Sequence, residues 1–152
     1  MLFRSESEKV PDKALIYIKR AEATPLESKV LAEVMTIYVD DRVLSKIQVA
    51  PNHPESKLQK ALLHEAILND IALRSLAELR GDPPSYDAIK ESLLGSLLKV
   101  LAKKGQARTG TRQTPDDLMS ELFGNPSKFL TRIQAVVSLR NRADEAFEGS
   151  EE

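Results

Sequence analysis

Histidine is the one side chain in this sequence whose ordinary pKa lies near neutral pH, and the chain has only two, His53 and His64. His64-Glu65 supplies the first two residues of the H-E-x-x-H zinc pattern, but position 68 is leucine. A metal ion would have to recruit carboxylates such as Asp70, without thiolates or a second imidazole on the helix. We therefore expect His64 to be a structural or surface residue, and we expect no metal and no other cofactor.

Asp40-Asp41 is a second candidate for chemistry, since paired carboxylates serve in acid–base catalysis or hold magnesium. Neighbouring residues on a helix diverge by about 100 degrees, so these two do not aim at one point. Solvation, or an ion pair with Arg42 or Lys46, is the expected role. The sequence also has no G-x-S-x-G elbow, P-loop or G-x-G-x-x-G, and we predict no catalytic residue and no enzymatic activity.

Basic residues in the C-terminal half form the constellation that stands out most. Residues 90–142 carry 10 Lys/Arg against 4 Asp/Glu, or +6, in a chain whose net charge is −1. Mobile cations, free amides and hydroxyls between residues 99 and 112 suit a phosphate backbone. The predicted nucleic-acid-binding residues are Lys99, Lys103, Lys104, Arg108, Arg112, Lys128, Arg132 and Arg142.

The last three of these residues are expected to extend the surface along one helix. At about 100 degrees per residue, Lys128, Arg132 and Arg142 fall within about 40 degrees of one another. Aromatic residues are only 5% of the chain and tryptophan is absent, so bases are not expected to be recognised by stacking. Contact would be independent of sequence, with RNA or single-stranded DNA. The alternative is that these lysines only complement a helix dipole and keep a loop soluble.

The elements that must position these residues are predicted to be helices. Capping residues and prolines mark helix starts at Thr24-Pro25, Pro54-Glu55, Pro83-Pro84-Ser85, Thr114-Pro115 and Asn125-Pro126. Gly81, Gly105 and Gly124 stand where helix ends are expected. The fold class is therefore all-α, a compact bundle of five to six helices.

Apolar spacing agrees with most of these boundaries. Residues 26–38 fit one helix, residues 58–79 a second, and residues 89–101 a third. Thr36 to Val49, rich in β-branched residues on both sides of Asp40-Asp41, also fits a short β-hairpin, which stays open as an alternative. Periodicity does not assign the run Leu15 to Ile18.

The chain of 152 residues predicts a single helical domain, 1–148, followed by an acidic disordered tail, 149–152. Cysteine is absent, which excludes disulfides and thiolate metal sites. No apolar run approaches the roughly 18 residues of a membrane span, and Met1 to Val10 is too polar for a signal peptide. We expect a cytoplasmic protein with no membrane partner.

In size, predicted helix content and basic C-terminal half, the chain resembles the small non-catalytic helical subunits of CRISPR (Cascade-type) surveillance complexes, which serve in antiviral defence. The residues that carry the resemblance are Lys103, Lys104, Arg108, Arg112, Arg132 and Arg142. It implies phosphate contacts with a guide RNA or a displaced strand, within a larger assembly of protein subunits. The alternative function is a helical protein–protein interaction or self-association module with no nucleic-acid role.

Overall fold

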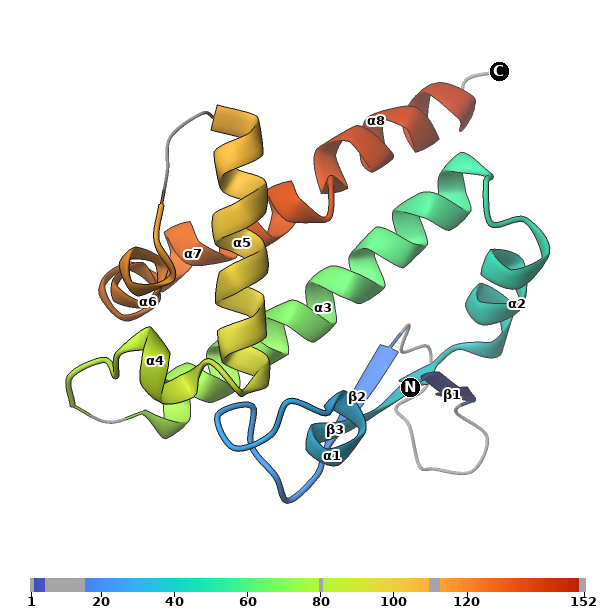
Figure 1. The fold of residues 1–152 in the computed structure, drawn as a ribbon. Helices are drawn as coiled ribbons and strands as arrows, with labels where there is room; N and C mark the ends of the chain where they lie inside the picture. Colours follow the sequence, from blue (N-terminus) through green and yellow to red (C-terminus); the bar gives the residue numbers. More distant parts are fainter. Residues whose placement is uncertain (1, 5–15, 80, 110–112, 151–152) are drawn as a thin grey trace.

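The fold is mostly helical, as predicted, and is built around one long helix (Figure 1). The computed structural model describes residues 2–4, 16–79, 81–109 and 113–150. The helices are α1 Leu31–Val34, α2 Asp41–Val49, α3 Pro54–Glu78, α4 Tyr86–Ile89, α5 Leu93–Thr109, α6 Pro115–Gly124, α7 Pro126–Val136 and α8 Leu139–Ser150. Eight helices in the described residues exceed the predicted five to six, because two expected helices are divided and α2 is an additional one.

A small sheet packs beside the helices, with strands β1 Leu2–Arg4, β2 Ile16–Arg20 and β3 Met35–Val39 in the order β1-β3-β2. β3 is the central strand, parallel to β1 and antiparallel to β2. Tyr17 lies opposite Tyr38, and their rings stack with centroids 6.0 Å apart. The apolar run before Arg20, which periodicity left unassigned, therefore supplies an edge strand.

The hairpin considered at 36–49 is wrong in its second half, because the chain enters a helix after β3. Asp40 is the N-cap of α2, and its carboxylate accepts the Arg42 backbone N–H at 2.8 Å. This hydrogen bond, followed by the interaction with the Arg42 side chain, lowers the pKa of Asp40. A capping aspartate thus ends the strand and starts the helix.

The helix expected over residues 26–38 is also wrong. Thr24-Pro25 starts a turn in which Thr24 Oγ1 accepts the Leu26 N–H at 3.3 Å, and only the four residues of α1 are helical. The apolar residues that follow form β3, where Met35, Ile37 and Val39 are almost fully buried. Period-four spacing here reflects burial of a central strand on both faces, which periodicity alone does not separate from a helix.

Arg74, on α3, binds the segment between β2 and β3 through hydrogen bonds. Its guanidinium donates to the carbonyl oxygens of Val34 and Ala21, both at 2.9 Å, and of Ala23 at 3.1 Å. The residue is only 7% exposed. A planar guanidinium with five N–H groups can serve several carbonyls at once, so one side chain holds the turn after β2 and the end of α1 in place.

α3 begins at Pro54, as the sequence predicts, and runs for 25 residues. His53 is its N-cap, with Nδ1 accepting the Glu55 N–H at 3.2 Å. α2, α5, α7 and α8 all contact α3; α5 crosses it and α8 lies along its first half (Figure 1). α3 is therefore the element against which both halves of the chain pack.

The helix predicted after Pro84 is divided into α4 and α5. Ser92, fully buried between them, donates from Oγ to the Ile89 carbonyl at 2.6 Å and accepts the Gly95 N–H at 3.1 Å. A Cβ on Gly95 would lie only 2.2 Å from the Ile89 carbonyl oxygen. The sharp bend between α4 and α5 thus depends on the hydroxyl of Ser92 and on the absence of a side chain at Gly95.

The starts predicted for α6 and α7 are confirmed. Thr114 and Asp117 form a reciprocal capping box, and the Thr114 backbone N–H lowers the pKa of the Asp117 carboxyl. Asn125 is the N-cap of α7 and accepts the Lys128 N–H at 3.2 Å.

The single last helix assumed for residues 128–142 is wrong, because Ser138 interrupts it with a φ of +57°. α7 ends before this residue and α8 starts after it in a new direction (Figure 1). Of the glycines expected past helix ends, Gly81 has the left-handed φ of +92°, but Gly105 lies within α5 and Gly124 is the last residue of α6.

One apolar core joins the sheet to the helices. Its fully buried members include Ile37 of β3, Leu94 and Leu98 of α5, Leu122 of α6 and Phe129 of α7. No helix in the described part of the chain is long and apolar enough to cross a membrane.

Candidate functional site

Of the eight predicted phosphate-binding residues, the six whose side chains the structure describes do not gather on one surface. Lys99, Lys103 and Lys104 are exposed on α5, and none of them has an ion pair with a carboxylate of the described residues. Arg108 belongs to the last turn of α5, but only its backbone is described, and Arg112 lies outside the described residues. The side chains of the predicted tail, 149–152, are likewise not described.

Lys128 and Arg132 converge on a carboxylate. Arg132 forms a two-pronged contact with Glu121 of α6, with Nη2 donating to Oε1 at 3.0 Å, and the Lys128 ammonium lies 3.8 Å from the same carboxylate. The hydrogen bond that the guanidinium donates to Glu121 raises the pKa of Arg132. These cations fix α7 to α6, so a phosphate would have to compete with Glu121 for them.

Arg142 is separated from Lys128 and Arg132 by the break at Ser138, so the ridge predicted for these three residues does not form. Arg142 stands on α8, where its guanidinium lies 3.5 Å from Glu145 in a half-exposed pair. It lines a different feature, a large hollow between α3, α5 and the α7–α8 junction.

This hollow has a volume of about 710 Å³ and an aliphatic floor. Its volume lies in the range of roughly 300–1,000 Å³ that is usual for ligand sites. The floor combines β3, α2 and α3, and its residues are Ile37, Leu44, Ile47, Leu63, Ile67 and Leu68. Further walls come from α1, α5 and the end of α7, through Leu31, Val100, Val136 and Val137.

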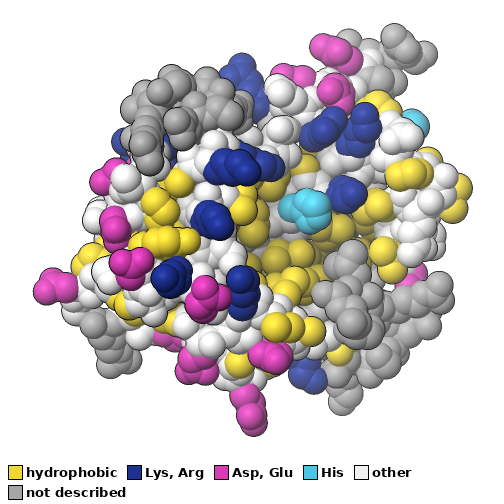
Figure 2. Space-filling view, in the orientation of Figure 1, with side chains coloured by type: hydrophobic (Ala, Val, Ile, Leu, Met, Phe, Trp, Pro, Cys, Tyr) yellow, Lys and Arg dark blue, Asp and Glu magenta, His cyan; other side chains and the backbone are white. Residues whose placement is uncertain are grey.

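Four basic side chains line the same hollow: Lys60, His64, Lys104 and Arg142. Lys60 and His64 are one turn apart on α3, Lys104 belongs to α5 and Arg142 to α8. No carboxylate is among the described lining residues. We name the aliphatic hollow together with these four side chains the basic groove. Figure 2 shows it as a yellow hollow with blue side chains and a histidine along its upper edge.

His64 marks the boundary between the apolar and charged parts of the basic groove. Burial against the aliphatic wall lowers the pKa of its imidazole, and the nearby charge of Lys60 lowers it further. The imidazole is therefore neutral at pH 7 in the free protein, and it can take up a proton when an anion approaches.

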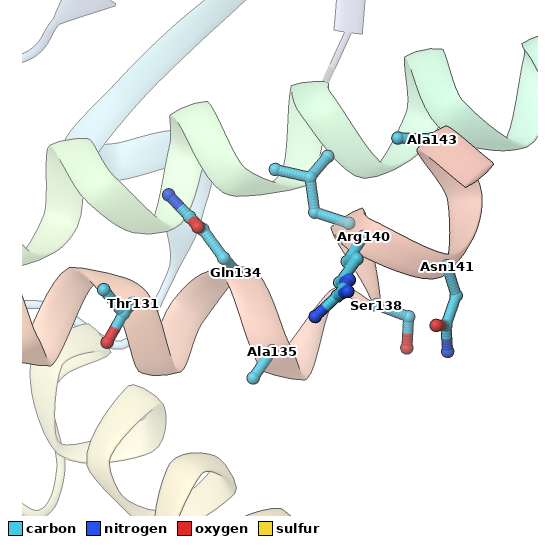
Figure 3. Close-up of a pocket in the computed structure, with 8 residues that line it drawn as sticks. Thr131, Gln134, Ala135, Ser138, Arg140, Asn141 and Ala143 are labelled. Atoms are coloured by element: carbon cyan, nitrogen blue, oxygen red, sulfur yellow. The ribbon is translucent and has the colours of Figure 1, made fainter. Parts of the chain in front are cut away.

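A smaller hollow of about 460 Å³ lies at the α7–α8 junction (Figure 3). Gln134 reaches toward α3, where its amide donates to Glu65 at 3.4 Å. Arg140 and Asn141 project from the start of α8 on the side away from α3. Arg140 is exposed and lies two residues after the break at Ser138. This hollow has fewer apolar side chains than the basic groove.

The other candidates for chemistry have structural roles. Asp40 caps α2 and lies 3.5 Å from the Arg42 guanidinium, as expected for an ion pair, whereas Lys46 pairs with Glu55. Asp70 pairs with Arg20 at 3.1 Å. Within the described ranges, no group of three His, Asp or Glu side chains is placed to hold a metal ion.

No family model matches the sequence, and the comparisons found no similar curated protein and no similar solved structure. The arrangement of side chains is therefore the basis for assigning a function.

Sequence reasoning missed the basic groove. A local signal was present in the spacing of the basic residues. Lys60 and His64 are four positions apart and so share one helix face, and Lys104 shares a face with Val100 in the same way. Both faces lie beside apolar stripes. The groove forms because α3, α5 and α8 pack together. This packing joins segments that are distant in the sequence, so no local pattern predicts it.

Proposed function

We propose that the protein is a non-catalytic interaction module, which binds a partner through the basic groove. The observation that supports this proposal is the composition of the groove: among the described residues, ten aliphatic and four basic side chains and no carboxylate line one hollow. An apolar surface removed from water supplies affinity, and surrounding cations select an anionic partner. This is the interaction role that the sequence left open beside nucleic-acid contact.

Binding rather than chemistry is supported by what faces the groove. His64 and Ser138 are the imidazole and the hydroxyl group among the described lining residues, the usual types of a base and the nucleophile that it activates. No hydrogen bond joins these two described side chains, whereas an activated nucleophile needs a base within hydrogen-bond reach.

The proposal can be tested with the anionic dye 1-anilinonaphthalene-8-sulfonate, whose fluorescence reports accessible apolar surface. Val100 lines the groove and is 44% exposed, so Val100→Glu places a carboxylate in the groove without burying a charge in the apolar core. We expect this variant to weaken dye binding by about tenfold. Val49→Glu is the matched control, because Val49 is 85% exposed and does not line the groove. Equal dye binding by both variants would show that the groove is not the site.

Contact with a nucleic-acid phosphate backbone is a second candidate, which the resemblance to CRISPR subunits implies. The observation that favours it is the exposed triplet Lys99, Lys103 and Lys104, which has no described carboxylate partner. A 30-residue oligothymidine should bind at 50 mM NaCl, and Lys99→Glu with Lys103→Glu should abolish binding. Lys29→Glu with Lys90→Glu is the control of equal charge change. Similar losses in the two double variants would indicate only a response to net charge.

A further inference from the structure

The shape of the basic groove restricts what can fill it. The hollow is open along one side (Figure 2), so an occupant is covered on one face and exposed on the other. Among the described lining residues, β3 is the one strand, and it is already paired on both edges by β1 and β2. A partner therefore cannot bind by adding a strand to β3, because β3 has no free main-chain edge. An amphipathic helix, with one apolar face, satisfies this geometry.

The charges restrict the occupant further. Lys60 and Lys104 are exposed and have no ion pair with a described carboxylate, and they reach the groove from α3 and α5. Arg142 reaches it from α8, and its half-exposed contact with Glu145 is weak enough to be exchanged. Cations on three helices can meet carboxylates at more than one point along an occupant, in addition to the apolar contact.

We infer that the occupant is an acidic amphipathic helix of a partner protein, with aliphatic residues at three- and four-residue spacing and carboxylates beside that stripe. The inference rests on the proposed function and names the partner class for the same groove. Aliphatic anchors of the helix would cover Ile47, Ile67 and Val100, and its carboxylates would pair with Lys60 and Lys104. This is the helix-in-groove mode of recognition, with charge setting the choice of partner.

The test uses three fluorescein-labelled peptides of 17 residues and measures fluorescence anisotropy with the full chain. The first peptide is a helix with leucines at three- and four-residue spacing and glutamates beside them. The second replaces every glutamate by lysine, and the third has the composition of the first in an order without helical periodicity. We expect the first peptide to bind at least tenfold more tightly than either of the others.

Variants of the protein locate the contact. Lys60→Glu with Lys104→Glu should weaken binding of the acidic helix by at least tenfold. Raising NaCl from 50 to 300 mM should weaken this binding only in part, because salt does not screen the apolar contact. Lys29→Glu with Lys90→Glu, which changes the same charge outside the groove, should have little effect. Equal binding of the helical and non-periodic peptides would overturn the inference, as would an equal loss in the two double variants.

A further probe separates failure of the inference from failure of the proposed function. Oleate, below its micellar concentration, offers an apolar chain and one carboxylate without a helix. If oleate displaces the dye from the wild-type protein but not from Val100→Glu, and the acidic helix does not bind, the groove is a binding site and the helix is the wrong occupant. If the Val100→Glu substitution changes the binding of none of the three probes, which are the dye, oleate and the acidic helix, both proposals fail.

Discussion

Arg74 is buried without an equally buried counter-charge, since the Glu78 carboxylate lies 3.5 Å away and is 31% exposed. Its charge is compensated mainly by the dipoles of carbonyl groups on the segment between β2 and β3. Removing the carbonyl partners of a buried guanidinium lowers the stability of the fold, and removing the guanidinium also lowers it, because the buried carbonyls lose their donor.

We therefore expect Arg74→Met to lower the free energy of unfolding by about 3 kcal/mol, because methionine fills the space and leaves buried carbonyls without a donor. Urea unfolding followed by circular dichroism measures this loss. Arg42→Met is the control, since the Arg42 side chain is 89% exposed and its loss should cost at most about 0.5 kcal/mol. Equal stability of the two variants would show that Arg74 does not hold the segment.

His64 predicts how recognition depends on pH. Burial, and then Lys60, lower its pKa in the free protein, and a carboxylate beside it in a complex raises that pKa. The complex then binds the proton more tightly, so affinity for the acidic helix rises as pH falls. The gain is complete below the pKa of the free protein and is lost as pH rises through the pKa of the complex.

Between pH 8 and pH 5.5 we expect an increase in affinity on the order of threefold to tenfold, measured by anisotropy. His64→Gln should remove this slope. His53→Asn is the control, since asparagine keeps a cap acceptor for α3 and the residue lies outside the groove. A slope that survives in His64→Gln would assign the titration to the peptide.

At the residue scale, sequence reasoning succeeded where a side chain acts on its own neighbours and not where it acts across the fold. The caps at Thr114 and Asn125 satisfy backbone groups within three residues, so their roles can be read locally. Arg74 contacts residues 40 to 53 positions away, and Arg132 contacts Glu121 on another helix. Nothing in the local pattern distinguishes these arginines from exposed ones.

At the scale of elements, three of the starts marked by a cap and proline were predicted correctly, the one at Thr24-Pro25 was not, and the interruptions within helices were missed. α3, α6 and α7 begin at the expected prolines. The breaks at Ser92 and Ser138 leave the apolar spacing of the sequence almost unchanged, because a bend changes the direction of a helix and not its periodicity. The predicted ridge failed for this reason, as it assumed a continuous helix through Ser138.

The bend between α4 and α5 gives a prediction with an internal control. Gly95→Ala would place a Cβ 2.2 Å from the Ile89 carbonyl oxygen, so the backbone must shift. We expect it to lower the free energy of unfolding by about 1–3 kcal/mol. Gly105→Ala, in the same helix with no atom within 4 Å of its Cβ, should instead raise it by about 0.5–1 kcal/mol. Both changes are measured by urea unfolding, and equal effects would contradict the close approach at Gly95.

At the scale of the whole molecule, the basic groove exists because both halves of the chain pack on α3. Its floor comes from residues 37–68, and its remaining walls come from α1, from α5 and from residues 136–142. Arg142 stands at the groove because α8 lies along α3 (Figure 1). Docking of α8 and recognition of a partner should therefore be coupled.

Ala146 allows this coupling to be tested, because it is the buried side chain in the described part of α8, with 6% exposure. Ala146→Glu puts a carboxylate into the contact with α3, and we expect it to cost about 2 kcal/mol and to increase amide hydrogen exchange throughout α8. Because α8 then no longer holds Arg142 at the groove, affinity for the acidic helix should fall about fivefold. Asn141→Glu adds the same charge at an exposed position of α8 and should leave exchange and affinity nearly unchanged. Faster exchange in Ala146→Glu with unchanged affinity would show that α8 contributes to the fold and not to the groove.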